Sequence, residues 1–189
     1  MDYNVIFVAG PQGSGKGTQG KRLADKLGFL FWEMGGTLRA IRASGTPLAE
    51  KISAMERGAL LSDELIIEVL KDQLPSIPLG KGVIFDGVPR RLGQGQFLVE
   101  YLKEHGVNKM ATIFIDVPRE ECVRRLLLRA QHESRVDDTP EAIAQRFRDY
   151  DEAIKAPMDY LRAQTKFITV DGTPAPDVIA ANINKALGV

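Results

Sequence analysis

The chain has 189 residues, of which 44% are hydrophobic, and its 25 lysines and arginines balance 25 aspartates and glutamates. This length suits one domain with a substantial core, and the balanced charge offers no overall basic field for nucleic acid or a membrane surface. The single cysteine, Cys122, excludes a disulfide framework, and without a signal-peptide start or an apolar run near the ~20 residues of a membrane helix the protein is predicted to be cytoplasmic.

Short apolar segments alternate with amphipathic segments in the first half of the chain. Residues 5–9 are apolar and end in Gly-Pro, which predicts a buried strand, and residues 16–27 predict a helix that ends at Gly28. Residues 29–32 predict a second strand. Three helices are then predicted near residues 35–44, 47–57 and 62–74, the last beginning at Ser62.

The same alternation continues to the end of the chain. Strands are predicted at residues 83–85, at 111–115 before Asp116, and at 167–170. Helices are predicted at residues 91–104, 119–130, 140–163 and 175–187. Such alternation predicts an α/β fold, a doubly wound parallel sheet of five strands flanked by helices, with ligands at the carboxyl ends of the strands.

The first of these strand ends carries a glycine-rich segment, GPQGSGKGT at residues 10–18, which opens the following helix. Strand, loop and helix in this order predict a P-loop, whose backbone N–H groups and helix N-terminus attract phosphate. Lys16 lies where it can reach the β- and γ-phosphates of a nucleotide. An ordinary glycine-rich turn is the alternative. Gly17 stands where the general pattern has Ser or Thr, and Thr18 follows it.

A second strand end carries Asp86, followed by Gly87-Val88-Pro89-Arg90. A carboxylate beside a P-loop can hold Mg²⁺ directly or through water, although Asp-Gly also forms simple turns. Arg90 can bind a phosphate with two hydrogen bonds, and the amide of Gln94, one helical turn further on, can recognise the edge of a base. Either of these side chains alone is more often a solvated surface residue.

Four arginines surround a polar segment in the second half of the chain. Arg125 and Arg129 are four residues apart and share one helix face, and Arg135 and Arg146 follow. Solvated salt bridges are the alternative for any one of them. Together with a P-loop, they predict a clamp for the negative charge that develops in phosphoryl transfer, under a polar flap that excludes water.

These motifs together resemble the adenylate kinase family of nucleoside monophosphate kinases, and the similarity runs nearly from end to end. The residues that carry it are GPQGSGKGTQ at 10–19, GALLSD at 58–63, DGVPR at 86–90 with Gln94, Arg125 with Arg129, RVDD at 135–138 with Arg146, and VDGT at 170–173. The short segment between Arg129 and Arg135 resembles members that lack the zinc-type lid.

The resemblance implies a P-loop core of residues 1–32, 63–128 and 140–189, a monophosphate-binding insertion of residues 33–62 and a short lid of residues 129–139. It implies reversible transfer of the γ-phosphate of MgATP to AMP, by a monomer that uses Mg²⁺ and no zinc and binds neither nucleic acid nor membrane. ATP would bind to Gly13, Ser14, Gly15, Lys16, Gly17, Thr18, Arg125, Arg129 and Pro174. AMP would bind to Gly35, Arg39, Leu60, Leu61, Gly87, Arg90, Gln94, Arg135 and Arg146. The catalytic set would be Lys16, Arg90, Arg125, Arg129, Arg135 and Arg146, with Asp86 ordering the water shell of Mg²⁺.

One segment, EMGGTLR at residues 33–39, departs from the family pattern. Met34 replaces a residue that often offers a hydroxyl to the acceptor base. Gly36 replaces an Asp, so that a helix cap is lost or passed to Thr37. Glu33 adds negative charge near an anion site, unless a cation of the lid or P-loop pairs with it.

Three other functions are weighed against adenylate kinase. A kinase for UMP, CMP or another monophosphate is favoured by Met34 and disfavoured by Gln94. A nucleotide-binding regulator without turnover is supported only by the altered segment 33–37. A P-loop kinase for a sugar or shikimate-like acceptor does not explain the DGVPR motif with Gln94.

Overall fold

A computed structural model describes residues 3–55, 61–133 and 139–189. At its centre lies a five-stranded sheet in the order β2-β3-β1-β4-β5, in which every neighbouring pair is parallel. The strands are β1 (Val5–Ala9), β2 (Leu30–Glu33), β3 (Val83–Asp86), β4 (Met110–Asp116) and β5 (Lys166–Asp171). The predicted fold class is therefore confirmed, and β1 occupies the middle of the sheet.

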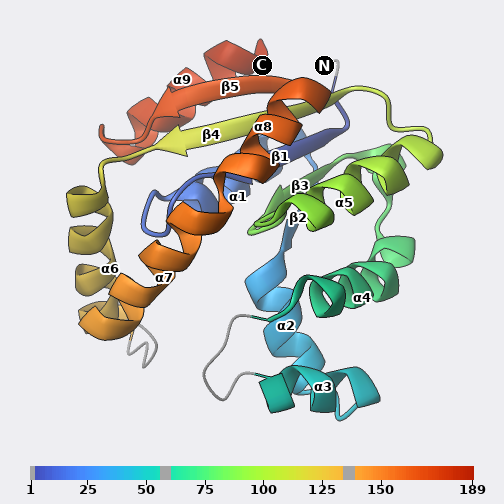
Figure 1. Ribbon diagram of the computed structural model, residues 1–189. Helices are drawn as coiled ribbons and strands as arrows, with labels where there is room; N and C mark the ends of the chain where they lie inside the picture. The colour runs from blue at the N-terminus through green and yellow to red at the C-terminus, as the bar shows by residue number, and fades with distance from the viewer. Residues whose placement is uncertain (1–2, 56–60, 134–138) are drawn as a thin grey trace.

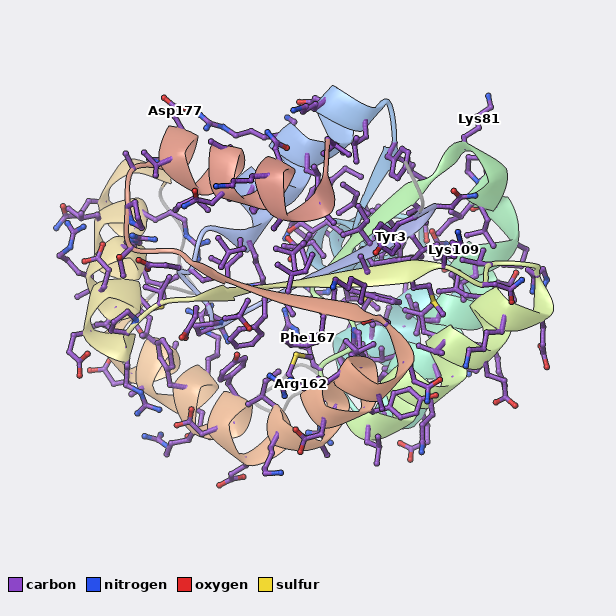
Figure 2. The ribbon with its side chains drawn as sticks, turned by 90° about the horizontal axis from the view of Figure 1, so that it is seen from above. Tyr3, Lys81, Lys109, Arg162, Phe167 and Asp177 are labelled. Atoms are coloured by element: carbon purple, nitrogen blue, oxygen red, sulfur yellow. The ribbon has the colours of Figure 1, made fainter. Side chains whose placement is uncertain are left out.

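Helices cover both faces of the sheet. Those in the described residues are α1 (Lys16–Leu27), α2 (Met34–Arg42), α3 (Pro47–Met55), α4 (Asp63–Gln73), α5 (Leu92–Glu104), α6 (Arg119–Glu133), α7 (Pro140–Ala153), α8 (Lys155–Gln164) and α9 (Pro176–Leu187). Figure 1 shows α2 and α3 leaving the sheet after β2 and α6 leaving it after β4. Figure 2 shows α1 and α9 on one face and α8 on the other. Each described helix is too short or too polar to cross a membrane.

The central strand shows why both faces are covered. Val5 and Phe7 belong to a core cluster that also holds side chains of α4, α5 and α8. Ile6 and Val8 belong to a second cluster, with side chains of α1, α6, α7 and α9. Successive side chains of a strand point to opposite faces, so a strand that is apolar at every position needs a layer on each side. Burying one such side chain stabilises the fold by about 1.5–3 kcal/mol.

Two of the predicted elements are corrected. The single helix predicted over residues 140–163 is two helices, because α7 ends at Ala153 and α8 begins at Lys155. Pro157 is the physical reason: it has no N–H for the carbonyl of Ala153, and its ring conflicts with that carbonyl. The helix predicted over residues 119–130 continues to Glu133, so it includes the first five residues of the segment predicted as a lid.

Candidate nucleotide-binding site

The loop between β1 and α1 has the backbone that a phosphate-binding loop needs. Gly13 and Gly15 have φ values of 82° and 87°, in the left-handed region that glycine adopts without strain. A Cβ atom at Gly13 would lie 2.5 Å from the carbonyl oxygen of Cys122. Gly15 is the N-cap of α1 and no described side chain caps this helix. Its first N–H groups can therefore bind an anion.

Lys16, at the start of α1, and Asp86, at the end of β3, carry opposite charges that act on each other. Asp86 ends β3 and is in register with Val8 of the neighbouring strand β1. The Nζ atom of Lys16 donates a hydrogen bond to the carbonyl oxygen of Pro11 at 3.4 Å. Burial lowers the pKa of Lys16, and the negative charge of Asp86 opposes this shift. Burial likewise raises the pKa of Asp86, opposed by Lys16. Each side chain thus lowers the cost of keeping the other charged in the site.

Asp86 also fits the role of holding hydrated Mg²⁺. Only 6% of the residue is exposed, and its Oδ1 atom has no hydrogen-bond partner among the described residues. A Cβ atom at Gly17 would lie 3.1 Å from the other carboxylate oxygen, Oδ2, so the carboxylate faces the start of α1. A buried carboxylate oxygen without a partner beside a phosphate loop matches the hard oxygen ligands that Mg²⁺ prefers.

Arg125 joins three elements around the P-loop. Its guanidinium donates to the carbonyl oxygens of Gly172 at 3.0 Å, Thr173 at 3.4 Å and Ser14 at 3.5 Å. Its Nε donates to Oε1 of Glu121 at 2.7 Å. Hydrogen bonds from Arg124 and Arg125 lower the pKa of Glu121 to about 2. Glu121 was not among the predicted site residues, although its spacing of four from Arg125 on a helix is a recognisable signal.

Arg90 and Gln94 are fixed by hydrogen bonds at the start of α5. The backbone N–H of Arg90 donates to Oε1 of Gln94 at 2.9 Å, and Nε of Arg90 donates to the carbonyl oxygen of Gly87 at 3.1 Å. Nε2 of Gln94 donates to Oδ1 of Asp63 at 2.9 Å. Asp63, which belongs to the family-like segment 58–63 but was not a predicted site residue, therefore orients the Gln94 amide. Each end of this amide keeps one further hydrogen-bonding position.

The altered segment 33–39 joins the last residue of β2 to the first six residues of α2. Helix α2 begins at Met34 with Glu33 as its N-cap and without a side-chain capping bond. Of the two predicted outcomes for the cap, loss is the one observed. Oε2 of Glu33 lies 3.6 Å from Nη2 of Arg39, so its described ion-pair partner belongs to the acceptor segment and not to the P-loop. Met34 is 3% exposed and packs in the core.

The remaining predicted residues differ in what the structure says of them. The charge of Arg129 acts on Lys16, and that of Arg146 acts on Arg90. Leu61 packs against the core, while Thr18 is exposed. Pro174 and Gly35 are partly buried. Leu60 and Arg135 lie outside the described residues.

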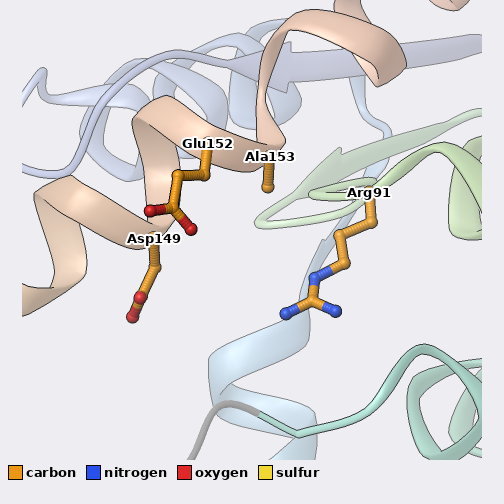
Figure 3. Close-up of a pocket in the computed structure, with 4 residues that line it drawn as sticks. All are labelled: Arg91, Asp149, Glu152 and Ala153. Carbon is orange, nitrogen blue, oxygen red and sulfur yellow. The ribbon is translucent and has the colours of Figure 1, made fainter.

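A pocket of about 390 Å³ lies beside the acceptor end of the site and is lined by Arg91, Asp149, Glu152 and Ala153. Figure 3 shows Arg91 on one side of it and the two carboxylates of α7 on the other. Arg91 follows Arg90 directly in the sequence. Its Nε atom lies 3.8 Å from Oδ1 of Asp63. No predicted site residue lines this pocket. In the described residues, no three side chains of His, Cys, Asp or Glu come close enough together to hold a metal ion.

A parallel sheet with a P-loop after its central strand, and a lysine, a carboxylate and arginines at its carboxyl edge, defines a P-loop phosphotransferase. The family model described as "Adenylate kinase" matches residues 8–166. The adenylate kinase of Thermus thermophilus is 42% identical over 186 residues, which cover 98% of this chain and 97% of that protein. Those of Maricaulis maris and Phocaeicola vulgatus are 39% and 37% identical over 183 residues. Each of these matches covers 96% of this chain and 97% of the relative. The chain belongs to the adenylate kinase family.

Proposed function

We propose that this protein transfers the γ-phosphate of MgATP reversibly to AMP, giving two molecules of ADP. The observation that carries this assignment is the meeting of Lys16, Asp86 and Arg90 at the carboxyl ends of β1 and β3. The charge of Asp86 acts on both Lys16 and Arg90, and the charge of Arg90 acts on Lys16. A cation from the donor loop and one from the acceptor side therefore face a single reacting centre.

On the donor side, the P-loop amides and Lys16 bind the phosphates of ATP. Arg125 and Arg129 add positive charge, and the loop around Pro174 contacts the adenine. Arg125 supports this role by joining Ser14 to Gly172, so that the P-loop and the loop after β5 keep one relative position. Asp86 would hold Mg²⁺ through water, and the ion would supply positive charge to neutralise the transferring phosphate.

On the acceptor side, Arg39, Arg90, Arg135 and Arg146 hold the phosphate of AMP, and Gln94 recognises its adenine. An oxygen of the AMP phosphate forms a bond to the γ-phosphorus while the bond from that phosphorus to the bridging oxygen breaks. The electron pair of the broken bond stays on the β-phosphate of the new ADP. Because the acceptor is itself the nucleophile, the protein has only to align the two phosphates and stabilise their charge.

The helices after β2 and the segment after α6 complete the proposed architecture. Residues 33–62, which include α2 and α3, form the acceptor-binding insertion, and residues 129–139 form a short lid over the donor. We propose a cytoplasmic monomer that uses Mg²⁺ and no zinc. Support for the insertion comes from α2, which directly follows the carboxyl end of β2, where ligands of such sheets bind.

The test is a coupled assay with MgATP and AMP, UMP, CMP, GMP or dAMP as acceptor. We expect kcat/KM to be highest for AMP, because the Gln94 amide keeps one donor and one acceptor position for the adenine edge. A preference for UMP or CMP would leave the phosphate machinery in place and move the error to the acceptor pocket. A folded protein that binds ATP without turnover would instead be a regulator.

A further inference from the structure

The side chain of Glu33 lies over the first turn of α2, where two glycines leave room for it. A Cβ atom at Gly35 would lie 3.2 Å from Oε1 of Glu33 and 3.3 Å from Nη1 of Arg39. A Cβ atom at Gly36 would lie 3.2 Å from Oε2 of Glu33. The carboxylate and the guanidinium thus share the helix face that side chains would cover at positions 35 and 36.

This carboxylate also lies close to the reacting centre. Glu33 ends β2 in direct register with Asp86 at the end of β3. Burial raises the pKa of Asp86, and the negative charge of Glu33 raises it further. The pKa of Arg90 is lowered by burial, and Glu33 opposes that shift. Glu33 is therefore a fixed negative charge that both the acceptor arginine and the Mg²⁺-binding carboxylate sense.

We propose that Glu33 sets the affinity for the acceptor monophosphate by competing with its phosphate for Arg39. This inference rests on the proposed function, in which Arg39 binds that phosphate. A carboxylate and a phosphate are both anions that pair with a guanidinium, and the N-terminus of α2 attracts either one. Before the acceptor binds, Arg39 is held by Glu33. The incoming phosphate must displace this carboxylate, so Glu33 weakens acceptor binding while the donor site is unaffected.

The first test is Glu33→Gln, which keeps the shape of the side chain and removes its charge. Because the pair is long and its side chains are 58% and 43% exposed, we expect KM for AMP to fall about two- to fivefold. The value of KM for ATP should stay unchanged. Competitive inhibition by adenosine should also stay unchanged, because adenosine has no phosphate to compete for Arg39.

Glu50→Gln is the matched control. Like Glu33→Gln, it removes one negative charge, but at an exposed position on α3, the helix that follows α2. KM for AMP should not change in this variant. Melting temperatures of both variants should lie close to that of the parent protein, since neither side chain is buried.

The second test places Glu33→Gln in an Arg39→Ala background. Arg39→Ala alone should raise KM for AMP, and adding Glu33→Gln should then have no effect, because the group under competition is gone. An unchanged or higher KM in Glu33→Gln, or a fall that persists without Arg39, would overturn the competition. If Arg39→Ala itself leaves KM for AMP unchanged, the assignment of Arg39 to the acceptor site is wrong, and the fault lies in the proposed function.

Discussion

The donor and acceptor sides of the site are built differently. On the donor side, Gly13 packs closely against the backbone of Cys122, and Arg125 bonds to the carbonyl oxygens of two separate loops. On the acceptor side, Arg39 pairs with Glu33 through exposed side chains on one short helix start. Backbone contacts fix a geometry that few substitutions can change, whereas a side-chain pair responds to one charge. We therefore expect substitution of the donor-side residues Lys16 and Arg125 to have larger effects than loss of the Glu33 charge.

The largest effect should come from Lys16→Ala. This change removes the P-loop cation that is proposed to bind the transferring phosphate, and we expect kcat to fall about 10²- to 10³-fold. ATP should still bind to the loop amides. Initial rates over a range of ATP concentrations test this, with exposed Lys21→Ala on the same helix as the control. A loss of less than tenfold in kcat would remove Lys16 from the catalytic set.

Arg90→Ala should act on the acceptor. Loss of a two-bond contact to phosphate is expected to lower kcat/KM for AMP about 10²-fold, with KM for ATP unchanged. Arg91→Ala is the control, because Arg91 faces Asp63 and the neighbouring pocket, and its effect should be much smaller. Equal effects of the two variants on kcat/KM for AMP would mean that Arg90 has no specific role.

Arg125→Ala tests the joining of the donor loops. Hydrogen bonds from the charged guanidinium to two loops are lost, and we expect KM for ATP to rise about tenfold. Arg124→Ala is a closely matched comparison, since Arg124 bonds to the same Glu121 but is exposed and has no described contact with either loop. It should change KM for ATP by less than about twofold. Similar KM values in both variants would contradict the donor-side role of Arg125.

The smallest effect concerns Glu121 and its dependence on pH. Its pKa falls from 4.5 to about 2 on folding, so its ion pairs stabilise the fold fully above pH 4.5 and are lost as the pH falls toward 2. Glu121→Gln should lower the melting temperature slightly at pH 7. The difference from the parent protein should shrink as the pH falls below 4.5. A difference that is constant with pH would mean that the charge of Glu121 contributes nothing.

Local patterns predicted the fold class correctly and made the phosphate-binding loop recognisable. The P-loop lies within nine consecutive residues, so its glycines, its lysine and its flanking strand and helix are visible together. The central strands β1 and β3 were predicted because their apolar side chains are buried on both faces. The break between α7 and α8 was missed, although Pro157 marks it in the sequence. The bond between Glu121 and Arg125 was also within reach, through their spacing on one helix.

Contacts between distant segments could not be predicted in this way. Gln94 is held by Asp63, 31 residues earlier, and only the packing of α4 against α5 brings the two together. The Gln94 amide was predicted to recognise a base, but its orientation depends on that carboxylate. Met34 was considered for its missing hydroxyl, whereas the structure buries it in the core. The sequence shows that the Met34 side chain is apolar, but it does not show which way that side chain points.

The sequence by itself determined the alternation of strands and helices, the phosphate-binding loop and the identity of the charged residues. These depend on the chemistry of neighbouring residues and on the periods of strand and helix, which are local properties. Tertiary structure decided which distant groups come together: Lys16 with Asp86, and Arg125 with the P-loop and the loop after β5. The distances between these groups depend on the strand order and on the loops at the edge of the sheet, which are properties of the whole fold.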